Sequence, residues 1–170
     1  MDYFIQQLIN GITLGGLYAL IALGYTMVYG VLKMINFAHG EVFMSGPFTA
    51  FFVADAMYRT DFLDAHPFLA LLVIFIVAMF ISTMIAFFLE KVAYRPLRGA
   101  PRLSPLITAS GASFFLQYLF RGLYGSGYQA YPVIKVLEGQ WVIFGVRILK
   151  FQLVVIVAAV LLMVALYSFI

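Results

Sequence analysis

An uninterrupted apolar run from Phe68 to Leu89 constrains the fold of this chain more than any other feature. The run carries no charged residue and exceeds the ~20 residues that a helix needs to cross a bilayer. The whole sequence is 65% hydrophobic and 10% charged, whereas a soluble domain is about half apolar and about a quarter charged. A chain of this composition cannot cover its surface with polar groups. We therefore predict an all-α fold, a polytopic bundle of transmembrane helices.

Apolar segments along the rest of the chain predict further helices. The expected helices cover approximately residues 5–32, 36–56, 67–89, 104–124 and 151–170. We expect residues 1–170 to form a single transmembrane domain. The last apolar run reaches Ile170 without a terminating charge, so we expect this domain to be the N-terminal fragment of a longer chain.

The second segment is predicted to be broken. Residues 42–54 are apolar but short, a length typical of buried or re-entrant segments, and Ser45–Pro47 interrupts them. Proline removes a backbone hydrogen bond and kinks a helix. Two structures fit this pattern: a kinked helix whose first turns include residues 36–41, or a re-entrant loop.

Polar groups beside this segment are costly in a membrane and invite a functional interpretation. The candidate hinge or gate comprises Asn36, His39, Glu41, Gly46 and Pro47. Discontinuous helices form such sites in transporters. The alternative interpretation is a helix cap followed by an interfacial polar turn, since asparagine favours caps and a carboxylate favours the first helical turn.

A second polar set lies in the fourth expected helix. Ser110, Ser113, Gln117 and Arg121 follow one another at spacings of three, four and four residues, which places them on one helix face. Ser110, Ser113 and Gln117 are our candidates for the lining of a translocation path. Arg121 is near the helix end, where its side chain is expected to extend to the interface.

The first expected helix carries small residues on one face. Gly11, Gly15 and Ala19 recur four apart, a spacing that lets another helix approach closely. We predict a helix-packing face here. The alternative is that glycine is merely frequent, as it is in membrane helices generally.

The charged connections predict an orientation. Residues 90–102 carry four basic residues and one acidic residue, so the positive-inside rule places them in the cytoplasm. If the second segment spans, residues 36–41 are also cytoplasmic, whereas residues 55–66, residues 125–150 and the N-terminus are external. Basic residues in the last connection argue weakly against this orientation. That connection also contains Trp141–Ile148, a β-branched and aromatic segment that predicts a small hairpin on the outer face.

Other classes of function are disfavoured. The net charge is only +3 and no basic face is apparent, so nucleic acid is not an expected partner. Without cysteine, and with only His39 and His66, no metal site or other cofactor is expected. No phosphate-binding loop or nucleophile motif is present. We therefore do not expect an enzyme.

Several blocks of sequence resemble one family. The segments Gln7–Leu20, Gly24–Glu41, Glu90–Arg98 and Gly139–Trp141 are similar, in the same order, to the permease subunits of branched-chain amino-acid ABC transporters. The resemblance implies a multi-pass permease domain in the bacterial inner membrane that translocates leucine, isoleucine and valine. It implies a second permease subunit, two ATP-binding cassette subunits that hydrolyse the ATP, and a periplasmic amino-acid-binding protein as partners. The loop that docks onto the ATPase is then expected after Ile170.

Three alternatives remain open at this stage. Related permeases for urea and short amides share the pattern of residues 36–41. His39 and Glu41 could instead relay protons in a secondary transporter. A membrane scaffold without a path would also show helix packing.

Overall fold

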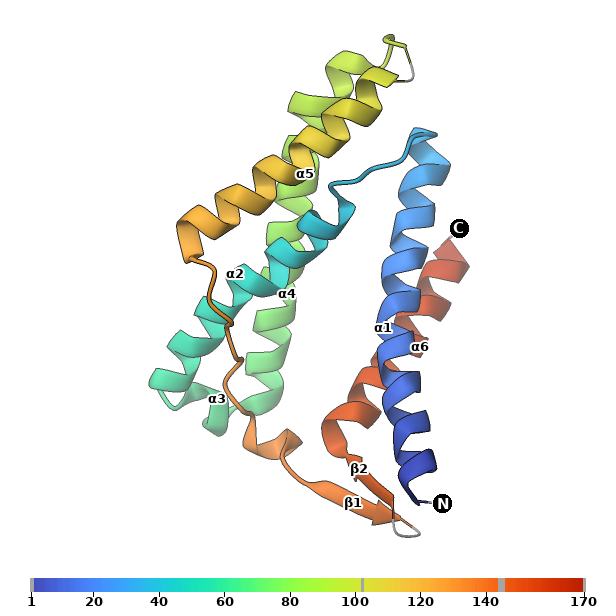
Figure 1. The fold of residues 1–170 in the computed structure, drawn as a ribbon. Helices are drawn as coiled ribbons and strands as arrows, with labels where there is room; N and C mark the ends of the chain where they lie inside the picture. The colour runs from blue at the N-terminus through green and yellow to red at the C-terminus, as the bar shows by residue number, and fades with distance from the viewer. Residues whose placement is uncertain (1, 102, 144–145, 170) are drawn as a thin grey trace. The chain divides into compact units, whose positions relative to one another are not determined.

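The computed structural model describes residues 2–101, 103–143 and 146–169, and helices dominate them (Figure 1). Within these residues, four helices are long and apolar enough to cross a membrane, namely Tyr3–Val31, Pro67–Leu97, Leu103–Tyr124 and Lys150–Ser168. The predicted class, an all-α polytopic membrane protein, is confirmed. The chain forms two units, one of Met1–Met27 with Val133–Ile170 and one of Val28–Pro132.

The first unit pairs the N-terminal part of α1 (Asp2–Leu32) with α6 (Lys150–Phe169). The Gln152 Nε2 atom donates a hydrogen bond of 2.6 Å to Asn10 Oδ1. About two helical turns further on, a Cβ atom placed on Gly16 would lie 3.3 Å from Ala159 Cβ. A small residue at this position therefore lets the two helices approach closely.

A two-stranded antiparallel hairpin precedes α6. Strand β1 (Gln140–Ile143) pairs with β2 (Val146–Leu149), and Gln140 lies opposite Leu149. The predicted hairpin is thus confirmed, although its central residues 144–145 lie outside the described residues. Gly139 precedes β1 with φ +112°, a conformation that favours glycine, and its carbonyl accepts a hydrogen bond from the Lys150 N–H.

The second unit contains α2 (His39–Arg59), the short α3 (Phe62–Ala65), α4 (Pro67–Leu89) and α5 (Leu103–Tyr124). Helix α2 packs along α4, with α5 against α2 (Figure 1). Helices α2 and α4 approach each other closely at Gly46, where an added Cβ would lie 2.5 Å from the Ala78 carbonyl oxygen. Ser82 Oγ supports this contact by donating a hydrogen bond of 3.1 Å to the Val42 carbonyl.

Helix α2 continues through Pro47 without reversing direction. The structure therefore agrees with a proline-containing second helix and not with a re-entrant loop at residues 42–54. Its bounds are shifted from those predicted: Asn36 precedes the helix, and the expected connection after residue 55 is helical as far as Arg59. An ion pair of 2.9 Å between Asp55 and Arg59, one turn apart, stabilises this end of the helix.

The expected loop after Leu89 is largely helical. Helix α4 continues into a π-helical turn, η1 (Glu90–Tyr94), and then a 3-10 turn, η2 (Arg95–Leu97). The prediction of a loop here was wrong because charged residues and prolines were taken to end the helix. Arg98 instead pairs with Glu90 across these turns. Arg102, which belongs to the same predicted loop, lies outside the described residues.

Candidate functional site

The polar residues ahead of α2 form a cluster with the end of α4. Asn36 Oδ1 accepts hydrogen bonds from the Ala38 N–H at 3.0 Å and from the Tyr94 hydroxyl at 2.7 Å. The first bond closes an Asx turn, which competes locally with helix. Asn36 therefore holds the connection outside the helix, and α2 begins at His39.

Tyr94 reaches Asn36 from the last residue of the π-helical turn. A π turn accommodates one more residue than an α-helical turn and is frequent at functional sites. The Tyr94 side chain is only 5% exposed. A cavity of about 330 Å³ adjoins the bond and is lined in part by Asn36, His39, Ser82 and Tyr94. The cluster therefore combines a buried polar contact with accessible space.

Glu41 connects this cluster to α5. Its Oε1 atom accepts a hydrogen bond of 3.3 Å from Ser113 Oγ, and both residues are half-buried. The distance exceeds the usual 2.7–2.8 Å of hydroxyl–oxygen bonds, so the bond is weak. Glu41 lies in the first turn of α2, where the helix dipole favours its negative charge. The structure thus brings together one residue of the predicted hinge and one of the predicted path.

The other two predicted path residues are placed differently. Ser110 Oγ donates a hydrogen bond of 3.1 Å to the Leu106 carbonyl of its own helix, and Gln117 is exposed. Their shared helix face follows from the spacing, and Ser113 is hydrogen-bonded to Glu41 of the predicted hinge. A lining role for the three residues remains a prediction.

Gly46 and Pro47 lie side by side in α2 but have different surroundings. Gly46 is buried against α4, whereas Pro47 is exposed. The Tyr131 hydroxyl donates a hydrogen bond to the Pro47 carbonyl. Gly46 thus provides a packing contact, and Pro47 provides the position at which α2 lacks an N–H donor.

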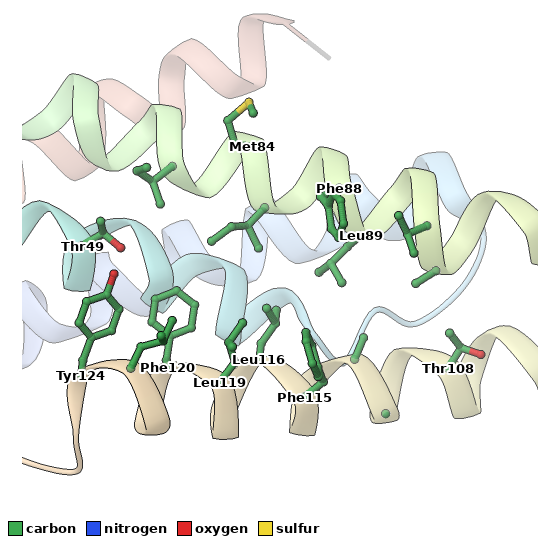
Figure 2. Close-up of a pocket in the computed structure, with 17 residues that line it drawn as sticks. Thr49, Met84, Phe88, Leu89, Thr108, Phe115, Leu116, Leu119, Phe120 and Tyr124 are labelled. Atoms are coloured by element: carbon green, nitrogen blue, oxygen red, sulfur yellow. The ribbon is translucent and has the colours of Figure 1, made fainter.

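A large apolar cavity is separate from the predicted path residues, none of which lines it. It has a volume of about 790 Å³ and lies between α4 and α5, with Thr49 of α2 at one end (Figure 2). Phe88 and Met84 line it from α4, and Phe115 and Leu119 line it from α5. Such a surface suits hydrocarbon and offers few groups to a polar solute.

Among the described residues of the first unit, none packs against the two glycines of the predicted α1 face. Gly11, Gly15 and Ala19 are exposed, and no atom lies within 4 Å of a Cβ placed on either glycine. Helix α6 instead meets α1 at Gly16. Packing through the Gly11 face remains a prediction and needs a helix other than α6.

Two residues of the cluster were not identified from the sequence. Tyr94 lies in the segment Glu90–Arg98, which carries part of the family resemblance, and Ser82 lies in the strongly apolar run Phe68–Leu89. The sequence signal that could have identified Ser82 is a polar side chain within an apolar run, because such groups need a hydrogen-bond partner in a membrane. Their partners are distant in sequence and gave no local pattern.

Comparison with known proteins points to one family. Residues 7–169 match the family model described as branched-chain amino acid transport system / permease component. The chain is 43% identical to the high-affinity branched-chain amino acid transport system permease protein BraD of Pseudomonas aeruginosa, and 43% identical to LivH of Escherichia coli and of Salmonella typhimurium. Each alignment covers 99% of this chain but 55% of the relative, so the chain spans little more than half their length. No solved structure matches the chain significantly.

Proposed function

Because the chain belongs to the family of permease components of branched-chain amino acid transport systems, we propose that it is a membrane-spanning subunit of an ABC importer. The solutes are leucine, isoleucine and valine, and the subunit crosses the bacterial inner membrane several times. The observation that carries this proposal is the family match over residues 7–169.

The complex that this subunit serves has four kinds of component. A second permease subunit completes the path, two ATP-binding cassette subunits hydrolyse ATP, and a periplasmic binding protein delivers the amino acid. The family match supports this division, because the family model describes the permease component of a transport system. ATP hydrolysis by the partners then drives the bundle between outward-open and inward-open states.

The proposed translocation path runs along the contact between α2 and α5. An amino acid carries an ammonium group and a carboxylate, and both need polar partners once they lose water. Glu41, Ser110, Ser113 and Gln117 supply such partners on the two helices. The 3.3 Å bond between Ser113 and Glu41 is weak enough to exchange for a bond to the solute. Selectivity for the aliphatic side chain lies mostly with the binding protein.

Helix α2 is the hinge of this mechanism. Asn36 anchors its N-terminal end to Tyr94, and Gly46 anchors its middle to α4. Pro47 provides no N–H for the Phe43 carbonyl, so resistance to bending is lowest here. His39 and Glu41, in the first turn, move with the part of the helix that precedes the proline.

Uptake of radiolabelled leucine tests the path. The full-length subunit and its partners are expressed in cells without other leucine importers, and the variants Ser113→Ala and Gln117→Leu are compared. We expect initial rates to fall about five- to tenfold, the effect of roughly one lost hydrogen bond to the solute. Ser168→Ala is the matched control, because this serine donates its hydrogen bond to the Val164 carbonyl within α6. An unchanged rate would remove the substituted residue from the path.

The same assay separates the alternative functions. Leucine uptake that requires ATP and the binding protein supports the proposal. Uptake driven by a proton gradient without ATP would instead indicate a secondary transporter. Strong competition by urea or acetamide would indicate an amide permease. Unaltered leucine uptake after deletion of the gene would indicate a scaffold.

A further inference from the structure

A second cavity lies where spanning helices meet their polar connections. Its volume is about 580 Å³, within the range of small-molecule sites. The end of α1, the π-helical turn, the 3-10 turn and the start of α5 surround it. None of the predicted hinge or path residues lines this cavity.

The cavity carries basic groups. Lys33 and Arg98 line it together with Glu90. Arg98 donates one Nη2 hydrogen bond to Glu90, and its side chain is still 67% exposed. Its remaining N–H groups and the exposed Lys33 ammonium are thus available, and the three side chains sum to one positive charge. An anionic group is therefore favoured here.

The backbone conformation of Lys33 supports a role for the lysine charge in ligand binding at this cavity. Lys33 directly follows α1 with φ +54°, a left-handed conformation that at a helix end is usually occupied by glycine or asparagine. Residues in such conformations gather at ligand sites. A lysine at this position places a cation at the cavity despite the less favourable backbone.

The remaining wall of the cavity is apolar. Aliphatic side chains from the end of α1, η2 and the start of α5 provide this surface, namely Val31, Met34, Ile35, Leu97, Pro105 and Leu106. A free phosphate ion would leave these groups uncovered. An amphiphile would place its anion against the basic residues and its hydrocarbon against the wall.

We propose that this cavity binds the headgroup phosphate and the first acyl carbons of an anionic phospholipid. The ends of spanning helices lie at headgroup depth, and basic pockets beside such helices recognise anionic lipids. The Asn36–Tyr94 hydrogen bond borders the same cavity through Tyr94. A bound lipid therefore stabilises the anchored start of α2.

Native mass spectrometry of the full-length subunit in its complex tests the proposal. The complex is titrated in neutral detergent with phosphatidylglycerol and, in parallel, with phosphatidylcholine of the same acyl chains. We expect a site that prefers phosphatidylglycerol, and the double variant Lys33→Gln/Arg98→Gln is expected to weaken its binding about thirtyfold. The matched control is Lys91→Gln/Arg95→Gln, which removes equal charge at two residues near Arg98 in sequence that do not line the cavity. The control is expected to bind like the wild type.

A second measurement needs no variant. Acylation of the Lys33 amine is followed by peptide mass spectrometry while phosphatidylglycerol, phosphatidylcholine or inorganic phosphate is added. Protection by phosphatidylglycerol alone supports the proposal. Equal protection by inorganic phosphate would show a simple anion site and overturn it. Equal binding of both lipids, equal loss in the control variant, or protection only by added ATP-binding subunits would each overturn it too.

Discussion

At the scale of single residues, Gly46 is the most closely packed of the described glycines in the second unit. An added Cβ would lie 2.3 Å from Ser82 Oγ and 2.5 Å from the Ala78 carbonyl oxygen. The serine side chain could rotate away, but the carbonyl belongs to a helix backbone and cannot. From sequence, this glycine was grouped with the hinge because of its neighbour Pro47. The distance to α4 is a tertiary feature that no local pattern encodes.

We expect Gly46→Ala to destabilise the protein by about 1–3 kcal/mol, because overpacking forces α2 and α4 apart. The measurement is the apparent melting temperature of the purified full-length protein in detergent. Gly40→Ala is the control in the same helix, where a Cβ meets no atom within 4 Å. The control should be neutral or slightly stabilising, since alanine favours helix over glycine. Equal melting temperatures for both variants would contradict the packing argument.

Sequence patterns identified Glu41 and Ser113 as functional candidates but did not predict the contact between them. Each was singled out from the sequence, Glu41 as a carboxylate at a membrane boundary and Ser113 as part of a polar helix face. Their hydrogen bond joins residues 72 positions apart, and helical periodicity relates only neighbours on the same helix. The spacing that groups Ser113 with Gln117 does not reveal that Gln117 is exposed.

At the scale of elements, the π-helical turn after α4 was missed and the apolar helices were recognised. Helices α4 and α6 follow from apolar runs that only a spanning helix accommodates. Residues 90–97 carry charges and a proline, a composition that indicates a loop. Their helical conformation depends on contacts made elsewhere, including the Tyr94–Asn36 bond and the pairing of Arg98 with Glu90. Such contacts override local preference.

We expect Tyr94→Phe to lower the free energy of unfolding by about 1 kcal/mol, because a buried hydrogen bond is lost. Asn36→Ala should cost more, since it also removes the bond to the Ala38 N–H. A double-mutant cycle in mixed micelles measures their coupling. Tyr118→Phe, at an exposed tyrosine of α5, is the control and should have no effect. Additive effects of the Tyr94 and Asn36 variants would show that the two side chains do not interact.

At the scale of the whole molecule, the orientation in the membrane depends on α2. Its 21 residues correspond to about 31 Å of helix, close to the ~30 Å of a hydrocarbon core. If α2 spans, residues 90–102 are cytoplasmic and the N-terminus is external. If it does not, the N-terminus moves to the cytoplasm. The basic loop predicts one side from sequence, and a second helix of similar length was predicted over residues 36–56, but the sequence left open whether that segment is a kinked helix or a re-entrant loop.

Single cysteines measure this orientation, because residues 1–170 contain no cysteine of their own. In intact spheroplasts, a membrane-impermeant maleimide should label Gly127→Cys and Tyr3→Cys. Gly99→Cys should react only after permeabilisation. Both glycines have open surroundings, so these substitutions are sterically tolerated. Labelling of Gly99→Cys in intact spheroplasts would invert the predicted topology, and protection of Tyr3→Cys alone would show that α2 does not span.

The amide pair between Asn10 and Gln152 has a consequence for biosynthesis. The two residues are 142 positions apart, so α1 is released from the ribosome long before its partner exists. Until α6 is synthesised, α1 therefore resides in lipid or beside the insertion machinery, and Asn10 has no hydrogen bond from Gln152. A nascent chain arrested before Gln152 should therefore remain crosslinkable to the translocon through its first helix, and lengthening the chain past α6 should release it.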